Sequence, residues 1–255
     1  MIPLTRLTSS LLISFSLFQL ADTAFAQSKE QDIVVTQAAT QRSIPTHVYL
    51  PQQLHKSKKT PVVLLSGGYK ASAQDSYLSY SFLAQALSAQ GFAVISVQHE
   101  SKDDAPLAFE GNIHEQRLPV WSRGVDHLHT VRKELAKKFP TFQWQKIFLI
   151  GHSHGGDIST LYAEKNSAQL AGLITLDHRR MPLPRHHQLP ILSLRSSDQT
   201  ADAGVLIADD DVSFPNIQIV PLDGVLHNAM DDSGDEETKA KILMEVRLFF
   251  RNLKL

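Results

Sequence analysis

The chain has 255 residues, a formal net charge of −1 at pH 7 and no cysteine. The balanced charge provides no basic stripe for nucleic acid and no polybasic segment for anionic lipid, so a neutral or small molecule is the expected ligand. The absence of cysteine excludes disulfides, thiol catalysis and lipid attachment through a cysteine.

Residues 1–26 have the features of a bacterial-type secretory signal peptide. A single basic residue precedes the apolar run over residues 11–20, which is too short to span a bilayer as a helix. Ala24-Phe25-Ala26 then fits an A-x-A cleavage site. We expect export to the periplasm or the medium, with one mature domain over residues 27–255 that begins at Gln27. An uncleaved anchor is the alternative, and no later segment is apolar enough to cross a membrane.

Strands and helices are predicted to alternate after residue 60, behind an edge hairpin at residues 32–35 and 47–50. The expected core strands are 61–65, 92–97, 146–150, 170–176, 190–194 and 217–221. The expected helices are 77–90, 119–139, 154–164 and 236–252. This alternation is typical of a mostly parallel sheet covered by helices on both faces. Only residues 177–189 separate the fourth and fifth core strands, which leaves no room there for a lid domain.

The pentad Gly151-His152-Ser153-His154-Gly155 follows the third core strand. A buried strand, a tight turn centred on serine and a following helix form the setting of a G-x-S-x-G nucleophile elbow. Glycines on either side leave room where a Cβ would meet the neighbouring strand and helix. The Ser153 hydroxyl should stand above a helix N-terminus, which favours the negative charge of an acyl-transfer transition state. Ser153 is therefore the predicted nucleophile, with a plain glycine-rich turn as the alternative.

The turn Ser66-Gly67-Gly68-Tyr69 follows the first core strand and is the candidate oxyanion loop. Its glycines allow backbone N–H groups to turn toward the serine. We expect the N–H of Tyr69, flanked by Gly68, to act with the N–H of His154, the residue after the nucleophile. An ordinary Gly-Gly turn is the alternative.

Two loops at the same edge of the sheet supply the expected general base and acid. His227 follows the last core strand and should take the proton of Ser153. Asp198 follows the fifth core strand and is the expected carboxylate that orients His227, with a helix-capping role as the alternative. Asp177, directly after the fourth core strand, is the alternative acid. The chain order serine, acid, histidine matches this architecture.

Other polar features give weaker signals. No metal-binding spacing of the H-E-x-x-H or Cys–His type is present, so neither a catalytic metal nor a cofactor is expected. Asp209-Asp210-Asp211 is predicted to be a solvated loop, because the spacing of a calcium loop is absent. Residues 100–118 form a long connection that either walls the site or lies on the surface. The histidines that could crowd the mouth of the site are His152, His154, His178, His186 and His187.

On these residues the chain resembles a small, lidless α/β-hydrolase over residues 45–255. The stretch Arg123-Gly124-Val125-Asp126, followed by the elbow, resembles the platelet-activating-factor acetylhydrolase and dienelactone-hydrolase-like branches. The resemblance implies hydrolysis of a carboxylic ester through an acyl-enzyme. The family usually has His-Gly where this oxyanion turn has Ser-Gly-Gly. A peptidase or acyltransferase on the same triad, or a non-catalytic binding protein of this fold, are the alternatives.

Overall fold

The computed structural model describes residues 29–51, 59–70, 75–208 and 212–253. The predicted signal peptide and Asp209-Asp210-Asp211 lie outside these residues. The strands are β1 (Lys29–Gln37), β2 (Arg42–Leu50), β3 (Thr60–Ser66), β4 (Ala93–Val97), β5 (Phe142–His152), β6 (Leu170–Leu176), β7 (Ile191–Arg195) and β8 (Ile217–Pro221). The helices are α1 (Ser81–Ala89), α2 (Ile113–Lys138), α3 (Ser153–Asn166) and α4 (Glu236–Asn252), with short 3-10 helices η1 (Ser76–Leu78), η2 (Ser167–Gln169) and η3 (His227–Ala229).

The strands form one sheet in the order β1-β2-β4-β3-β5-β6-β7-β8. β2 runs antiparallel to both β1 and β4, and every other neighbouring pair is parallel. The predicted hairpin is confirmed with longer strands; within it β1 is an edge strand of the sheet, and β2 pairs on both sides. The mostly parallel α/β class is also confirmed.

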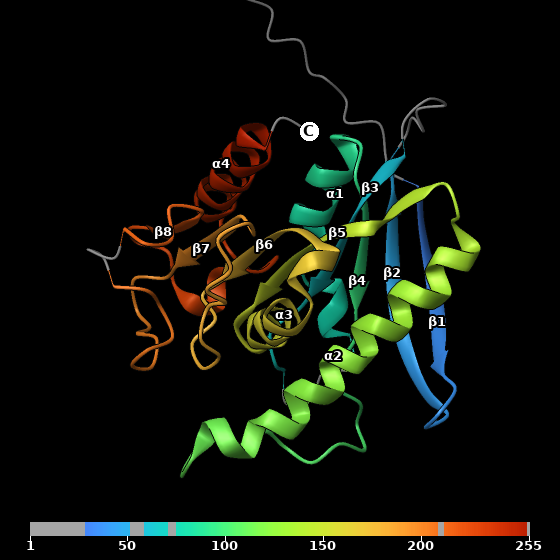
Figure 1. Ribbon diagram of the computed structural model, residues 1–255, viewed down its shortest axis with the longest axis horizontal. Helices are drawn as coiled ribbons and strands as arrows, with labels where there is room; N and C mark the ends of the chain where they lie inside the picture. Colours follow the sequence, from blue (N-terminus) through green and yellow to red (C-terminus); the bar gives the residue numbers. More distant parts are fainter. Residues whose placement is uncertain (1–28, 52–58, 71–74, 209–211, 254–255) are drawn as a thin grey trace, which may run out of the picture.

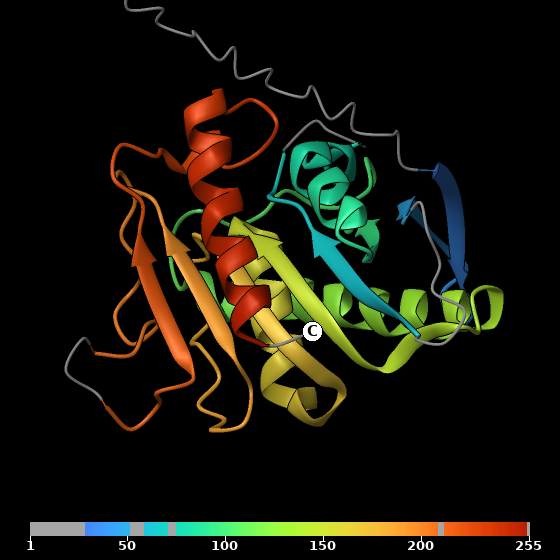
Figure 2. The ribbon, with the colours of Figure 1, turned by 90° about the horizontal axis from the view of Figure 1, so that it is seen from above.

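Helices cover both faces of the sheet, with α2 and α3 on one side and α1 and α4 on the other (Figure 1, Figure 2). Alternate strand residues point to opposite faces, so Val62 and Leu64 pack in one core cluster and Val63 and Leu65 in the other. Trp121 of α2 and Tyr162 of α3 belong to the first cluster, together with these strand residues. Buried on both faces, the central strands are continuous apolar runs.

Helix α2 begins at Ile113, six residues earlier than predicted. A helix that began at Pro119 would place the proline in the first turn, where proline is favoured. Instead Asn112 caps the helix, because its side chain accepts a hydrogen bond from the N–H of Glu115. Pro119 therefore lies in the helix interior and has no N–H for the carbonyl of Glu115. The extra turns extend α2 beyond the sheet, toward the loops that follow the strands (Figure 1).

The connection between β6 and β7 contains no helix, so no lid domain is inserted there. The parallel strands β3, β5, β6, β7 and β8 all end at one edge of the sheet, where ligands of open α/β sheets bind. In the described part of the chain, no helix is both long and apolar enough to cross a membrane.

Candidate active site

Ser153 occupies a strained turn between β5 and α3. Its φ is positive and lies in the left-handed region, which non-glycine residues seldom adopt. A Cβ on Gly151 would lie 2.3 Å from the carbonyl oxygen of Gly155. A Cβ on Gly155 would lie 2.3 Å from the carbonyl oxygen of Ser66. Both contacts are with backbone, so only glycine fits, as the elbow motif requires.

His227 brings its ring between a hydroxyl and a carboxylate. It opens η3, in the loop after β8, and is buried. Its Nε2 lies 3.0 Å from Ser153 Oγ, and its Nδ1 lies 2.5 Å from Asp177 Oδ2. A serine, a histidine and a carboxylate therefore form one continuous hydrogen-bonded chain.

Asp198 does not contact the ring of His227, so the prediction that it orients the imidazole is wrong. Its Oδ1 instead accepts a hydrogen bond from the backbone N–H of His227, at 2.7 Å. Ser197 donates from both N–H and Oγ to the carbonyl of Val225, which ties this loop to the main chain of the histidine loop. Asp198 is therefore held beside the backbone of His227, while the ring points toward the end of β6. Asp177, the alternative acid, takes the position beside the His227 ring that was predicted for Asp198.

Asp177 is itself held by the end of β7. Arg195 Nη2 lies 2.7 Å from Asp177 Oδ1, and Ser196 donates to the carboxylate from its N–H (3.2 Å) and its Oγ (2.7 Å). Burial alone would raise the pKa of Asp177, but the bond to His227, the Arg195 charge and the Ser196 bonds together lower it to about 2. The carboxylate is thus ionised at neutral pH. A sequence signal did exist for it, because an arginine at the end of a buried strand needs a carboxylate partner.

Gly68 is not free to bind an oxyanion, which corrects its expected part in the oxyanion hole. Its N–H donates to the hydroxyl of Tyr80 at 2.8 Å. The N–H groups of Tyr69 and His154 have no hydrogen-bond partner among the described residues. The N–H groups of Tyr69 and His154 therefore remain the candidate donors of the oxyanion hole. A Cβ on Gly68 would lie 2.7 Å from His152 Nδ1, so glycine is required there by packing.

A buried hydrogen-bond chain connects the oxyanion loop to the histidine loop. The carbonyl of His227 can only accept, so His152 Nε2 carries the proton and donates to it at 3.0 Å. His152 Nδ1 of the neutral ring then accepts from the Tyr80 hydroxyl at 2.7 Å, and that hydroxyl also accepts from the N–H of Gly68. Burial, with the nearby His227, lowers the pKa of His152 to about 3 and keeps it neutral. His152 thus fixes two backbone segments and does not face the mouth of the site.

Residues 100–118 wall the site, the first of the two predicted alternatives. Trp121 Nε1–H donates to His154 Nδ1 at 3.2 Å, so His154 Nε2 carries the proton and points at the Glu100 carboxylate, 2.8 Å away. The Leu107 N–H donates to the Tyr69 hydroxyl at 3.4 Å, and the Phe109 ring lies 6.1 Å from that of Tyr69. The wall therefore contacts both residues with candidate oxyanion donors.

The remaining histidines do not converge on the site. His178 is buried without a polar partner for its ring among the described residues. His186 Nε2 bonds to the carbonyl of Glu164, and His187 stacks on Phe214. The described residues contain no group of three or more His, Cys, Asp or Glu side chains that could hold a metal.

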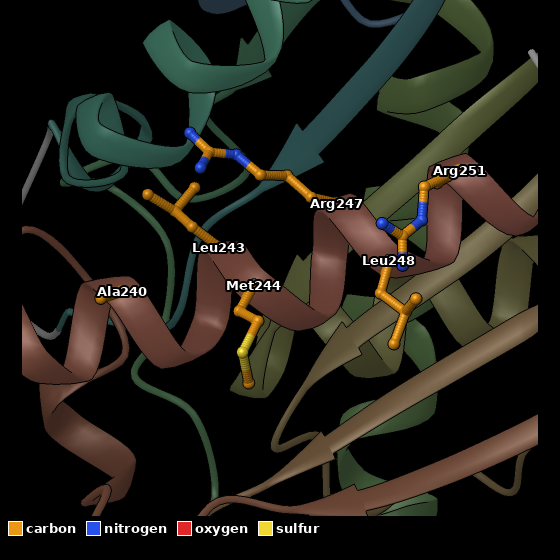
Figure 3. A pocket seen from close by; sticks show the side chains of 6 residues that line it. All are labelled: Ala240, Leu243, Met244, Arg247, Leu248 and Arg251. Atoms are coloured by element: carbon orange, nitrogen blue, oxygen red, sulfur yellow. The ribbon is translucent and has the colours of Figure 1, made fainter.

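A hollow of about 560 Å³ lies on the surface of α4 (Figure 3). Its lining contains no hydroxyl, imidazole or carboxylate group, so it is not the candidate active site. The residues that line it are Ala240, Leu243, Met244, Arg247, Leu248 and Arg251.

Comparison with known proteins agrees with this fold. A family model described as serine aminopeptidase, S33, matches residues 56–176. No curated protein gives a significant sequence match. A thermostable esterase aligns with a TM-score of 0.60 and 14% identity, over 87% of this chain, which spans only 62% of that esterase.

Two further solved structures are similar over nearly their whole length. Est1E from Butyrivibrio proteoclasticus aligns with a TM-score of 0.60 and 13% identity, over 87% of this chain and 98% of its own. A candidate dienelactone hydrolase from Klebsiella pneumoniae aligns with a TM-score of 0.60 and 16% identity, over 88% and 99%. The sheet order, the elbow at Ser153 and the similar solved structures give the chain the α/β-hydrolase fold, and the serine aminopeptidase model matches its residues 56–176.

Proposed function

We propose that the protein hydrolyses carboxylic esters through an acyl-enzyme formed on Ser153. The observation that carries this proposal is the hydrogen-bonded chain from Ser153 through His227 to Asp177. In the first half-reaction Ser153 Oγ attacks the ester carbonyl and His227 Nε2 takes its proton. The N–H groups of Tyr69 and His154 stabilise the oxyanion. His227 then gives the proton to the departing alcohol.

Water completes the reaction at the same site. His227 removes a proton from the water that attacks the acyl-enzyme and returns it to Ser153 Oγ as the acid leaves. Asp177 holds the ring with Nδ1 protonated and stabilises the imidazolium that forms in each step. The lowered pKa of Asp177, about 2, keeps this negative charge in place at neutral pH.

Ester cleavage is favoured by the esterases among the structural relatives. The family model carries the description of a serine aminopeptidase, which makes a peptidase the second candidate. Short acyl chains are the expected substrates, because no lid domain interrupts the described connection between β6 and β7. p-Nitrophenyl esters of increasing acyl length, assayed beside aminoacyl p-nitroanilides, compare the two activities.

A fluorophosphonate probe tests the nucleophile directly. The probe should label the wild-type protein on a peptide containing Ser153 and should not label Ser153→Ala. Ser43→Ala, an exposed serine on β2, is the matched control and should be labelled fully. Ser153→Ala should lower kcat by about 10⁴-fold or more with an unchanged fold. A variant that keeps a tenth of the wild-type activity would exclude Ser153 as the nucleophile.

Export is proposed on the sequence of residues 1–26. The periplasmic or secreted protein should begin at Gln27, as read by N-terminal sequencing. Retention of Met1 on exported protein would refute cleavage after Ala26.

A further inference from the structure

Arg117 carries a buried positive charge that forms no ion pair with a carboxylate of the described residues. The residue is only 6% exposed. Its Nε donates to the carbonyl of Ala108 at 2.7 Å, and its guanidinium lies 4.8 Å from the centre of the Phe109 ring. Among the described residues, no acceptor is found for its two Nη groups. Other arginines of the chain do pair with carboxylates: Arg42, Arg123, Arg180 and Arg195.

The position of Arg117 places this charge on the wall of the active site. Trp121, one helical turn further along α2, donates to the side chain of His154. Phe109, beneath the guanidinium, faces the ring of Tyr69, which lies 6.2 Å from the ring of His154. Arg117 thus packs in the same assembly as the two residues with candidate oxyanion donors.

Two more guanidinium groups reinforce the charge. Arg179 and Arg180 follow the proposed catalytic acid by two and three residues. Burial lowers the pKa of Arg117 most; Asp157 opposes this effect, and Arg180 and Arg179 lower the pKa further. Arg180 pairs with Asp202, whereas the Arg179 guanidinium donates to the neutral side chain of Gln199.

Asp157 only partly compensates this charge. Its Oδ1 accepts the backbone N–H groups of Arg180 and Met181, at 2.9 and 3.0 Å. Burial raises the pKa of Asp157, which disfavours its negative charge. Burial of a cation without a full counter-charge raises the free energy of the folded protein, so a bound anion beside Arg117 would be stabilised.

We propose that Arg117 binds a free carboxylate of the substrate, so that the preferred substrates are small half-esters of dicarboxylic acids. This inference rests on the proposed esterase function. With Nε already bound to Ala108, the guanidinium presents the edge formed by its two Nη groups, which matches one planar carboxylate. The same charge would repel the ammonium group of an aminopeptidase substrate. The formal net charge of −1 does not reveal this local excess of positive charge.

The test compares an anionic ester with a neutral one, mono-p-nitrophenyl glutarate and its methyl ester. The wild type should hydrolyse the anionic ester with a kcat/KM about tenfold or more higher, mostly through a lower KM. Arg117→Gln should abolish this preference, and Arg117→Lys should retain part of it. Arg123→Gln, on the same helix and paired with Asp104, removes the same charge and should keep the full preference. A wild type without the preference, or an Arg117→Gln variant that keeps it, would overturn the proposal.

A binding experiment separates this proposal from the proposed ester hydrolysis. Monomethyl glutarate is titrated calorimetrically into Ser153→Ala and into the double variant Ser153→Ala, Arg117→Gln. Binding should weaken about tenfold or more in the double variant. If neither p-nitrophenyl ester is hydrolysed, the esterase function fails, but the calorimetric difference still decides the role of Arg117. Equal binding to both variants would refute it.

Discussion

Replacing the two aspartates near His227 separates their roles. In Asp177→Asn, the amide should stay in place, because Ser196 and Arg195 still surround it. The amide N–H₂ would donate to His227 Nδ1, which moves the ring proton to Nε2 and removes the base that faces Ser153. Loss of the tautomer and of imidazolium stabilisation lowers kcat by about 10⁴-fold, equivalent to about 5.5 kcal/mol of transition-state stabilisation.

Asp198→Asn should behave differently, because Asp198 bonds to a backbone N–H and not to the ring. Asparagine keeps a side-chain oxygen that can accept this bond, so kcat/KM should stay within about threefold of wild type. Asp198→Ala loses the acceptor and should cost about 1 kcal/mol of stability.

The assay uses one p-nitrophenyl ester at one pH, with circular dichroism and thermal melts on each variant. Asp177→Asn also leaves Arg195 without its carboxylate, so a lower Tm is expected alongside the lower kcat. Activity must therefore be measured below the melting transition. An inactive Asp198→Asn beside a near-normal Asp177→Asn would refute the reasoning.

Three further predictions test the surroundings of the site. Because a Cβ on Gly155 would meet backbone oxygen, Gly155→Ala should lower the free energy of unfolding by about 3 kcal/mol, and unchanged urea denaturation would contradict this. Tyr80→Phe removes the hydroxyl that the Gly68 N–H and His152 Nδ1 share. Leaving these two buried groups unpaired should cost about 2 kcal/mol by the same measurement, and a stability equal to wild type would refute the hydrogen-bond chain. Burial lowers the pKa of four histidines to about 3 or about 4 in the folded protein: His99, His127, His152 and His178. Their pKa rises to its ordinary value on unfolding, so stability should fall as the pH is lowered, by about 2 kcal/mol for each histidine at pH 5, and a flat profile from pH 7 to 5 would exclude this.

The sequence by itself determined the order of elements and the nucleophile. Continuous apolar runs predicted the buried strands, since a strand covered on both faces has no polar side. Residues 170–176, 217–221 and 236–252 agree with the elements of the structure at both ends. The pentad around Ser153 predicted its strained turn, because glycine spacing responds to local backbone contacts. His227 followed from its place after the last strand.

Tertiary structure alone decided which carboxylate meets the ring. Asp177 and Asp198 follow adjacent strands, so sequence position places both at the same edge of the sheet. The choice depends on side-chain direction, which the turn at Asp177 and the backbone bonds around Ser197 set over a few ångströms. The same reason explains Gly68, whose N–H is taken by a tyrosine twelve residues away, and the unpaired charge of Arg117. Chain spacing determines where backbone segments lie, but hydrogen-bond partners depend on directions that only the packed structure fixes.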